Sequence, residues 1–291
     1  MGHFVGLLAS GVAQGAIAAL IALGIVLLHQ TTGVVNFAQG DLLTLGAYFG
    51  VWLVVDHGIA TIPAYLIVVA LVFGVGVAME RIGYAPLRRQ PILAVVISTF
   101  ALALGLRSLI ILWQGNDQKT LPSPFGGRVW HFAGAAIPYQ SVLIVAVTGV
   151  VLAGLMLMLH RSSIGRQVRA LAADRETALL QGIRVTRLSV LMFGLSAALA
   201  GLGGVLVAPT LTVSPQLGFT LLLSSFAATV LGGFDRMGAT VLAAFGIAIV
   251  QQMAAGYVSA DYVEAYPYLI LLVALVLRPS GLFGEVVRVR Y

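Results

Sequence analysis

Hydrophobic residues gather in nine long runs along this 291-residue chain, with short polar stretches between them. Most runs approach or exceed the ~20 residues that an α-helix needs to cross a bilayer. The pattern therefore predicts an all-α integral membrane protein, a polytopic bundle of about eight transmembrane helices. The run at 219–232 is short and ends in glycines, so we expect it to be tilted or partly re-entrant. The runs cover residues 4–28, 38–55, 62–80, 92–113, 139–159, 188–208, 219–232, 238–256 and 264–278.

The composition of the chain agrees with this class. Sixty per cent of the residues are hydrophobic and 9% are charged, whereas soluble domains typically carry about 45–50% apolar and about 25% charged residues. The mean hydropathy is +1.03. The first run is too long for the hydrophobic core of a cleaved signal peptide, so it is predicted to be the first span. The absence of cysteine excludes disulfides and thiolate metal sites.

The basic residues predict the orientation of the chain, because cytoplasmic loops are enriched in Lys and Arg. If every run crosses the membrane, the basic loops all fall on one side, with the N-terminus outside and the C-terminus in the cytoplasm. The same distribution accounts for the net charge of +6 without a nucleic-acid partner. The residues concerned are Arg81, Arg88, Arg89, Arg161, Arg166, Arg169, Arg175, Arg184, Arg187, Arg236, Arg278, Arg288 and Arg290.

The 34 glycines of the chain are expected to serve helix packing. In lipid, small residues four positions apart let two helix backbones approach each other closely. Gly11 and Gly15 form one such pair within the first run, and Gly46 and Gly50 form another within the second. We therefore predict a close helix–helix contact at each pair.

Residues 165–182 form the longest charged segment, reading GRQVRALAADRETALLQG. Val168, Leu171, Ala172 and Leu179 recur at helical spacing, and Arg166, Arg169 and Asp174 are directed elsewhere. The pattern predicts a short amphipathic helix at the membrane surface between two spans. The simpler alternative is a solvated loop helix that serves only to orient the protein.

Residues 29–41, reading HQTTGVVNFAQGD, form a polar stretch between two spans that contains no Lys or Arg. Irregular polar backbone at membrane depth is tolerated where it lines a cavity or is buried in protein. Broken helices of this kind form substrate paths in transporters. An ordinary turn, with Asn36 capping the following helix, explains the pattern equally well.

Three stretches, taken in order along the chain, point to one family. Asn36-Phe37-Ala38-Gln39-Gly40-Asp41 is followed by Leu45-Gly46-Ala47-Tyr48, and residues 165–182 continue into SAALAGLGGVL at 196–206. The third stretch is LGGFDRMGA at 231–239. Together, on matching hydrophobic runs, they resemble the permeases of ABC importers for branched-chain amino acids, specifically the LivH-type inner-membrane subunit. The resemblance covers nearly the whole chain.

The resemblance implies a single permease domain over residues 1–291 in the inner membrane of a bacterium. In that family two separate cytoplasmic subunits hydrolyse ATP, and a periplasmic binding protein delivers the substrate. A second permease subunit, of the LivM type, would complete the pathway. The chain itself would be no enzyme and would hold no cofactor or metal.

The resemblance also implies roles for particular residues. A cytoplasmic coupling segment at about 161–187 would dock on the ATPases, and the polar stretch at 36–41 would line the translocation path. The coupling residues would be Gly165, Arg166, Arg169, Ala170, Asp174, Ala178 and Gly182. The path residues would be Asn36, Phe37, Gln39, Gly40 and Asp41.

The substrate stays open at this stage. The family often has His where this chain has Gln39, and Glu where it has Asp41. Relatives import urea, short amides, aromatic acids and other amino acids, so these remain alternatives to branched-chain amino acids.

Several other function classes find little support in the sequence. It contains no GxxxxGK[ST] phosphate-binding loop, and its five histidines lack metal-ligand spacing. An ion-coupled secondary transporter usually places acidic or His side chains near the membrane midplane. Asp41 is the candidate for that role, and it lies near the end of a span. Arg107 lies inside the fourth run, where we expect it to extend toward the outer surface rather than bind substrate.

Overall fold

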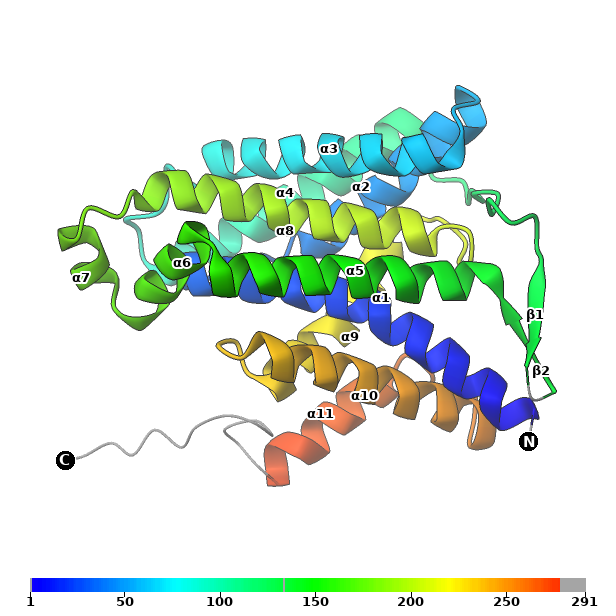
Figure 1. The fold of residues 1–291 in the computed structure, drawn as a ribbon. Coiled ribbons are helices and arrows are strands. Elements are labelled where there is room, and N and C mark those ends of the chain that lie inside the picture. Colours follow the sequence, from blue (N-terminus) through cyan, green and yellow to red (C-terminus); the bar gives the residue numbers. More distant parts are fainter. Residues whose placement is uncertain (1, 133, 278–291) are drawn as a thin grey trace.

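The computed structural model describes residues 2–132 and 134–277, which form a helical bundle with one small β-hairpin (Figure 1). Two π-helical turns, η1 and η2, extend the C-terminal ends of α2 and α3. The helices are α1 Gly2–Thr32, α2 Gln39–Val51, α3 Thr61–Met79, α4 Ile92–Gln114, α5 Tyr139–Arg161, α6 Ser163–Ala173, α7 Arg175–Leu180, α8 Val185–Val207, α9 Leu217–Gly232, α10 Met237–Tyr257 and α11 Tyr266–Leu277. The other elements are η1 Trp52–Asp56, η2 Glu80–Tyr84, β1 Val129–Phe132 and β2 Ala135–Pro138.

Each of the nine hydrophobic runs contains a helix, which confirms the polytopic all-α prediction. Six helices of the described chain are long and apolar enough to cross a membrane, namely α1, α3 with η2, α4, α5, α8 and α10. The run at 219–232 corresponds to α9, whose 16 residues span about 24 Å at 1.5 Å per residue. This is shorter than the ~30 Å hydrocarbon core. Residue 278, the last of the ninth run, lies outside the described residues.

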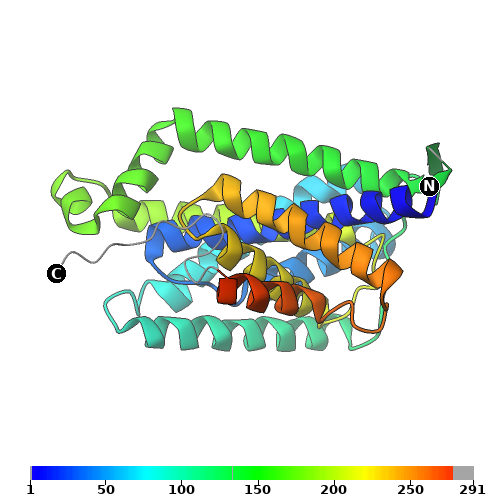
Figure 2. The ribbon, with the colours of Figure 1, turned by 90° about the horizontal axis from the view of Figure 1, so that it is seen from below.

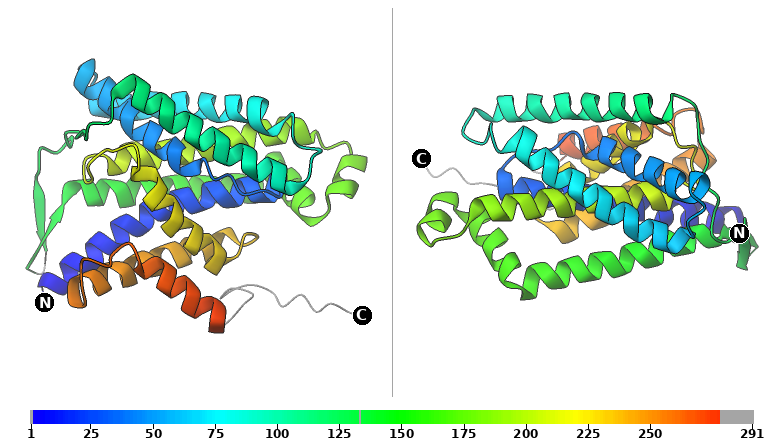
Figure 3. Two further views of the ribbon diagram at one scale, coloured as in Figure 1. Left: turned by 180° about the vertical axis from the view of Figure 1, so that it is seen from behind. Right: turned by 90° about the horizontal axis from the view of Figure 1, so that it is seen from above.

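Helices α1 and α8 form the centre of the bundle. In the most apolar 18-residue window of α1, 89% of the residues are buried, against 83% in α8 and only 22% in α4. Both helices are rich in glycine and alanine, and these small residues let neighbouring helices pack closely around them. Figure 2 and the right-hand view of Figure 3 show α4 and α5 along opposite edges of the bundle, with α1 and α8 between them.

The two predicted glycine pairs do mediate close packing. A methyl group added to Gly11 or Gly15 would lie 2.9 Å from the backbone of α10. One added to Gly46 would lie 2.5 Å from Gly201 of α8, and one added to Gly50 would lie 2.7 Å from Val205. Small-residue faces therefore join α1 to α10 and α2 to α8, as the spacing predicts.

The elements that connect the helices are divided between two ends of the bundle. Helices α6 and α7 lie at one end, and the β-hairpin lies at the other with the first turn of α1 (Figure 1). The turn between α9 and α10 lies at the same end as α6 and α7. Arg278, Arg288 and Arg290, part of the orientation prediction, lie outside the described residues.

The β-hairpin has no counterpart in the sequence-based prediction, which left residues 114–138 as a loop. Strands β1 and β2 pair antiparallel, with Phe132 opposite Ala135 and Trp130 opposite Ile137. Gly134, in the connection, has a φ of +79°, a left-handed conformation that glycine adopts without strain.

Candidate functional site

The amphipathic segment is two helices, so the prediction of one continuous helix over residues 165–182 is wrong. Helix α6 ends at Ala173 and α7 starts at Arg175, and Asp174 between them has an extended backbone. We call α6 and α7 together the elbow. Val168 and Leu171 are buried as predicted, whereas Ala172 and Leu179 are exposed.

Asp174 creates the break because its side chain caps α7. Its Oδ1 accepts the backbone N–H groups of Glu176 at 2.9 Å and Thr177 at 3.2 Å. Its Oδ2 accepts the Thr177 hydroxyl at 2.5 Å. These hydrogen bonds, chiefly those from Thr177, favour the ionised carboxylate and lower the pKa of Asp174. An aspartate with these partners starts a new helix at this point.

Four of the other predicted coupling residues shape the path of the chain through the elbow, and two of these four are buried. Gly165 is buried, and any side chain there would overlap the Leu159 carbonyl at the end of α5. Arg169 donates a hydrogen bond to that same carbonyl. Ala178 is buried, and Gly182 ends the segment with a φ of +79°. These residues hold the chain in its path between α5 and α8.

The residues on the elbow that are available to a partner include two of the predicted coupling residues, Arg166 and Ala170, and two leucines outside that set. Arg166 is exposed and Ala170 is half-buried. Leu180 is 89% exposed and its neighbour Leu179 is 53% exposed. The sequence pattern assigned Leu179 to the apolar face of a single helix and did not include Leu180, so it gave no signal that the two leucines are exposed together. Two adjacent exposed leucines on a projecting helix form an apolar tip that a protein partner can cover.

The polar stretch at 29–41 is a structured connection packed among helices. Helix α1 continues to Thr32, and Asn36 Oδ1 accepts the Ala38 N–H at 3.0 Å in the turn before α2. Asn36 therefore stabilises the turn without capping α2, whose N-cap residue is Ala38. The Phe37 ring stacks on Phe100 of α4 with centroids 4.3 Å apart.

Gln39 joins three helices at the centre of the bundle. Its Nε2 donates to the Ser196 carbonyl of α8 at 2.9 Å, and its Oε1 accepts the Ser196 hydroxyl at 2.9 Å. The Ser196 hydroxyl also lies 2.8 Å from the Gly24 carbonyl of α1. Gln39 has no exposed surface, and a side chain at Gly24 would overlap its amide. This buried polar network ties α2 to α1 and α8 and fixes their register.

Gly40 places α2 against the start of α9. A side chain on either Gly40 or Gly218 would overlap the backbone carbonyl of the other. The Gly218 N–H donates to the Thr44 hydroxyl at 2.9 Å, which ties the two helices together at the same place.

Asp41 forms an ion pair with Arg107 of α4. Arg107 Nε lies 2.9 Å from Asp41 Oδ1, and the two side chains are 23% and 3% exposed respectively. Arg107 Nη2 donates to Asp41 Oδ2 at 3.3 Å, and the guanidinium also lies 5.6 Å from the centroid of the Phe219 ring. The expectation that Arg107 extends to the outer surface is therefore wrong. The buried carboxylate holds it inside the bundle, since two opposite charges out of water need each other as partners.

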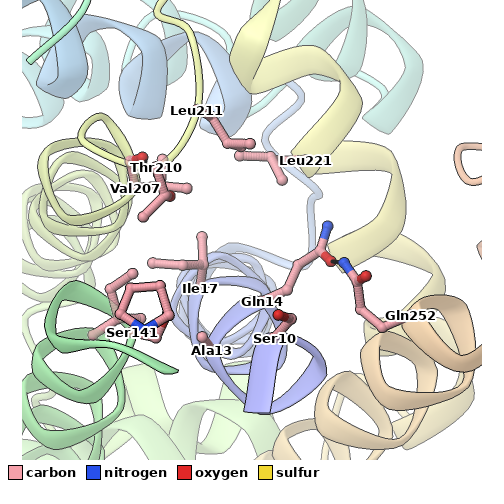
Figure 4. A pocket seen from close by; sticks show the side chains of 12 residues that line it. Ser10, Ala13, Gln14, Ile17, Ser141, Val207, Thr210, Leu211, Leu221 and Gln252 are labelled. Atoms are coloured by element: carbon pink, nitrogen blue, oxygen red, sulfur yellow. Dashed lines mark hydrogen bonds between the residues drawn. The ribbon is translucent and has the colours of Figure 1, made fainter. Parts of the chain in front are cut away.

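A cavity of about 280 Å³ opens in the half of the bundle nearer the hairpin (Figure 4). The Gln252 side chain of α10 donates a hydrogen bond to the Gln14 side chain of α1 on its wall. We call it the Gln14–Gln252 cavity. Its wall mixes amides and hydroxyls with aliphatic side chains, and none of its lining residues is charged. Other lining residues include Ser10, Ile17, Ser141, Val207, Thr210, Leu211 and Leu221.

The predicted path residues 36–41 do not line this cavity. The first turns of α9 lie between the two places, because Leu221 faces the cavity while Gly218 packs on Gly40. Within residues 2–132 and 134–277, no group of three or more His, Asp or Glu side chains is placed to hold a metal ion.

Comparison with known proteins agrees with this architecture. A sequence profile described as "Branched-chain amino acid transport system / permease component" matches residues 7–277. The chain is 28% identical to the high-affinity branched-chain amino acid permease proteins BraD of Pseudomonas aeruginosa and LivH of Escherichia coli K12, over 97% of this chain and 96% of each relative.

A more distant sequence match and one solved structure of similar fold extend the comparison. The chain is 26% identical to the ribose import permease protein RbsC of Escherichia coli K12, over 77% of this chain and 68% of that protein. A solved structure of PsaBC from Streptococcus pneumoniae in complex with Fab superposes with a TM-score of 0.52 at 13% identity. The superposition covers 94% of this chain and 91% of that one.

Proposed function

The chain belongs to the family of branched-chain amino acid permease components, and we propose that it is the membrane-spanning subunit of an ABC importer for branched-chain or other apolar amino acids. The match of the family profile to residues 7–277 is the observation that carries this proposal. The named relatives at 28% identity are high-affinity branched-chain amino acid permeases over nearly their full length.

The energy for transport would come from two separate cytoplasmic ATPase subunits. The elbow, within the coupling segment at 161–187, would dock on an ATPase through the exposed Leu179 and Leu180. Its end of the bundle would then face the cytoplasm, as the basic loops predict, with the N-terminus in the periplasm. A periplasmic binding protein would deliver the substrate at the opposite end, and a LivM-type permease would be the second membrane subunit.

The substrate would enter through the Gln14–Gln252 cavity. Its uncharged amides and hydroxyls suit the polar end of an amino acid, and its aliphatic side chains suit an apolar side chain. The beginning of α9 would then separate this chamber from residues 36–41, which would line the inner part of the path. Movement of α9 away from Gly40 would open the route.

Two experiments test the proposal. Affinity purification of the tagged chain from mildly solubilised membranes should recover an ATPase and a second hydrophobic permease. The purified complex is placed in liposomes with its ATPase subunits facing the lumen and the binding protein added outside. It should take up labelled leucine only when ATP is present in the lumen.

Competition in the same liposomes separates the substrate classes. Excess isoleucine or valine should suppress leucine uptake, whereas urea, short amides and aromatic acids should not. Uptake by the chain alone without ATP would overturn the proposal in favour of an ion-coupled secondary transporter.

A further inference from the structure

The β-hairpin presents large apolar side chains that the described part of the chain leaves about half exposed. Trp130 is 49% exposed and Phe132 is 54% exposed, and every residue of β1 is exposed. The two rings lie against each other with centroids 5.5 Å apart. Exposed aromatic side chains in this arrangement indicate a partner surface.

The register of the hairpin shows which way these side chains point. Residues directly opposite each other in an antiparallel pair lie on the same face. Trp130 and Phe132 therefore share a face with their partners Ile137 and Ala135. Ala135 is buried and Ile137 is half-buried, whereas Ala136 on the opposite face is exposed.

That face is the one turned toward α1. A methyl group added to Gly6 of α1 would lie 3.9 Å from the Ala135 side chain. Strand β2 thus rests on the first turns of α1, and β1 lies beyond it with its aromatic side chains directed to the same side. Figure 1 shows the hairpin running across the end of the bundle, at a large angle to the membrane-spanning helices.

The hairpin is part of a group of exposed aromatic residues at this end. Tyr139 begins α5 and is 40% exposed, and Trp113 near the end of α4 is 42% exposed. Tyr257, at the end of α10, is 61% exposed and packs edge-on against His3. Trp and Tyr are enriched where a membrane protein meets the lipid headgroups. The elbow end presents leucines instead.

We propose that the 129–138 hairpin lies on the bilayer, with Trp130 and Phe132 inserted among the headgroups and upper acyl chains of the leaflet at this end. The occupant of the apolar face is lipid, because that face is directed toward the membrane-embedded helices. A soluble protein approaching from the aqueous side would meet the opposite face, with Val129, His131 and Ala136. The hairpin thereby anchors the ends of α1 and α5 at a fixed depth.

The register also supplies a matched control for the test. The chain has three tryptophans, so Trp52→Phe with Trp113→Phe leaves Trp130 as the reporter. Adding Trp130→Phe and His131→Trp moves the reporter by one residue to the opposite face. Both variants are placed in lipid discs, with lipid brominated near the carbonyl end of the acyl chain or with aqueous iodide as the quencher.

We expect the brominated lipid to remove most of the emission of Trp130 and little of that of the His131→Trp variant, and iodide to do the reverse. Equal quenching of both reporters by either agent would overturn the proposal. So would iodide quenching of Trp130 that is relieved only by the periplasmic binding protein, a result that would make the hairpin a docking surface for that protein. If the reporter variants do not fold, the emission of the single variant Trp130→Phe is subtracted from that of the unaltered chain. The difference is the emission of Trp130, and its quenching by brominated lipid and by iodide is compared directly.

Discussion

The ion pair between Asp41 and Arg107 leads to a quantitative prediction about stability. Arg107→Met keeps the length of the side chain but leaves the Asp41 carboxylate without its cation. Because that carboxylate is only 3% exposed, we expect Arg107→Met to lower the free energy of unfolding by about 3 kcal/mol. This is the size of loss seen when one member of a buried ion pair is removed. Loss of the contact with the Phe219 ring adds about 0.5–1 kcal/mol.

Removal of the other partner, by Asp41→Ala, should lower the free energy of unfolding by less than Arg107→Met does. Arg107 is 23% exposed, and its long side chain can turn its charge toward the membrane surface once the carboxylate is gone. We expect a loss of about 1–2 kcal/mol from the remaining unpaired charge and the small cavity. The double variant leaves neither charge unpaired, so it should be more stable than Arg107→Met alone, with a loss of about 2 kcal/mol relative to the unaltered chain. The losses of the two single variants then exceed that of the double variant by a coupling energy of about 3 kcal/mol.

The assay is unfolding by SDS in mixed micelles, followed by tryptophan fluorescence, for the unaltered chain and all three variants. The reasoning depends on the coupling and on the order of the two single variants. If the losses of the single variants simply add in the double variant, the pair contributes nothing measurable. If Asp41→Ala is the more damaging single change, the carboxylate is not the buried partner that the structure indicates.

Three further predictions address other parts of the chain. Gly24→Ala should cost about 1–3 kcal/mol of unfolding free energy through overpacking, whereas Gly74→Ala, where a side chain meets nothing within 4 Å, should cost far less in the same SDS titration. Leu180→Asp should abolish recovery of the ATPase on affinity purification while Leu180→Met retains it; equal recovery would remove the apolar tip from the docking surface. The cap on α7 should be present at neutral pH and be lost as the pH falls through the lowered pKa of Asp174, because protonation weakens the acceptance of the Thr177 hydrogen bonds. Amide hydrogen exchange at Thr177 reports this loss, and Asp174→Asn, which cannot titrate, should show no such pH dependence.

Properties that depend on neighbouring residues could be predicted from the sequence. Hydropathy is local, so all nine apolar runs matched helices, and the glycine pair at 11 and 15 matched a close contact because its spacing alone defines a flat helix face. The break at Asp174 was also accessible, since an aspartate followed by an acidic residue such as Glu176 in the next turn is a helix-start signal. It was missed because the apolar positions on both sides of it fit a single helical period.

Partners that are distant in the chain could not be predicted. Asp41 and Arg107 are 66 residues apart, and their pairing depends on how α4 crosses α2. Gln39 looked like a polar residue of a substrate path, but its partners Ser196 and Gly24 belong to two other helices. The hairpin was missed because strands of four residues with large apolar side chains in β1 lack the alternation that marks an ordinary surface strand.

The deep burial of α1 has a consequence for how the chain enters the membrane. Of the six helices of the described chain that are long enough to cross a membrane, α1 is the most deeply buried, yet α8 begins about 150 residues after α1 ends. At ~5–20 residues per second of synthesis, this delay is roughly 8–30 s. During that time the surface of α1 that carries Gly11 and Gly15 must be covered by lipid or by the insertion machinery. Helix α1 is therefore in the membrane before α8 and α10 have been made, and these later helices complete the bundle by packing against it.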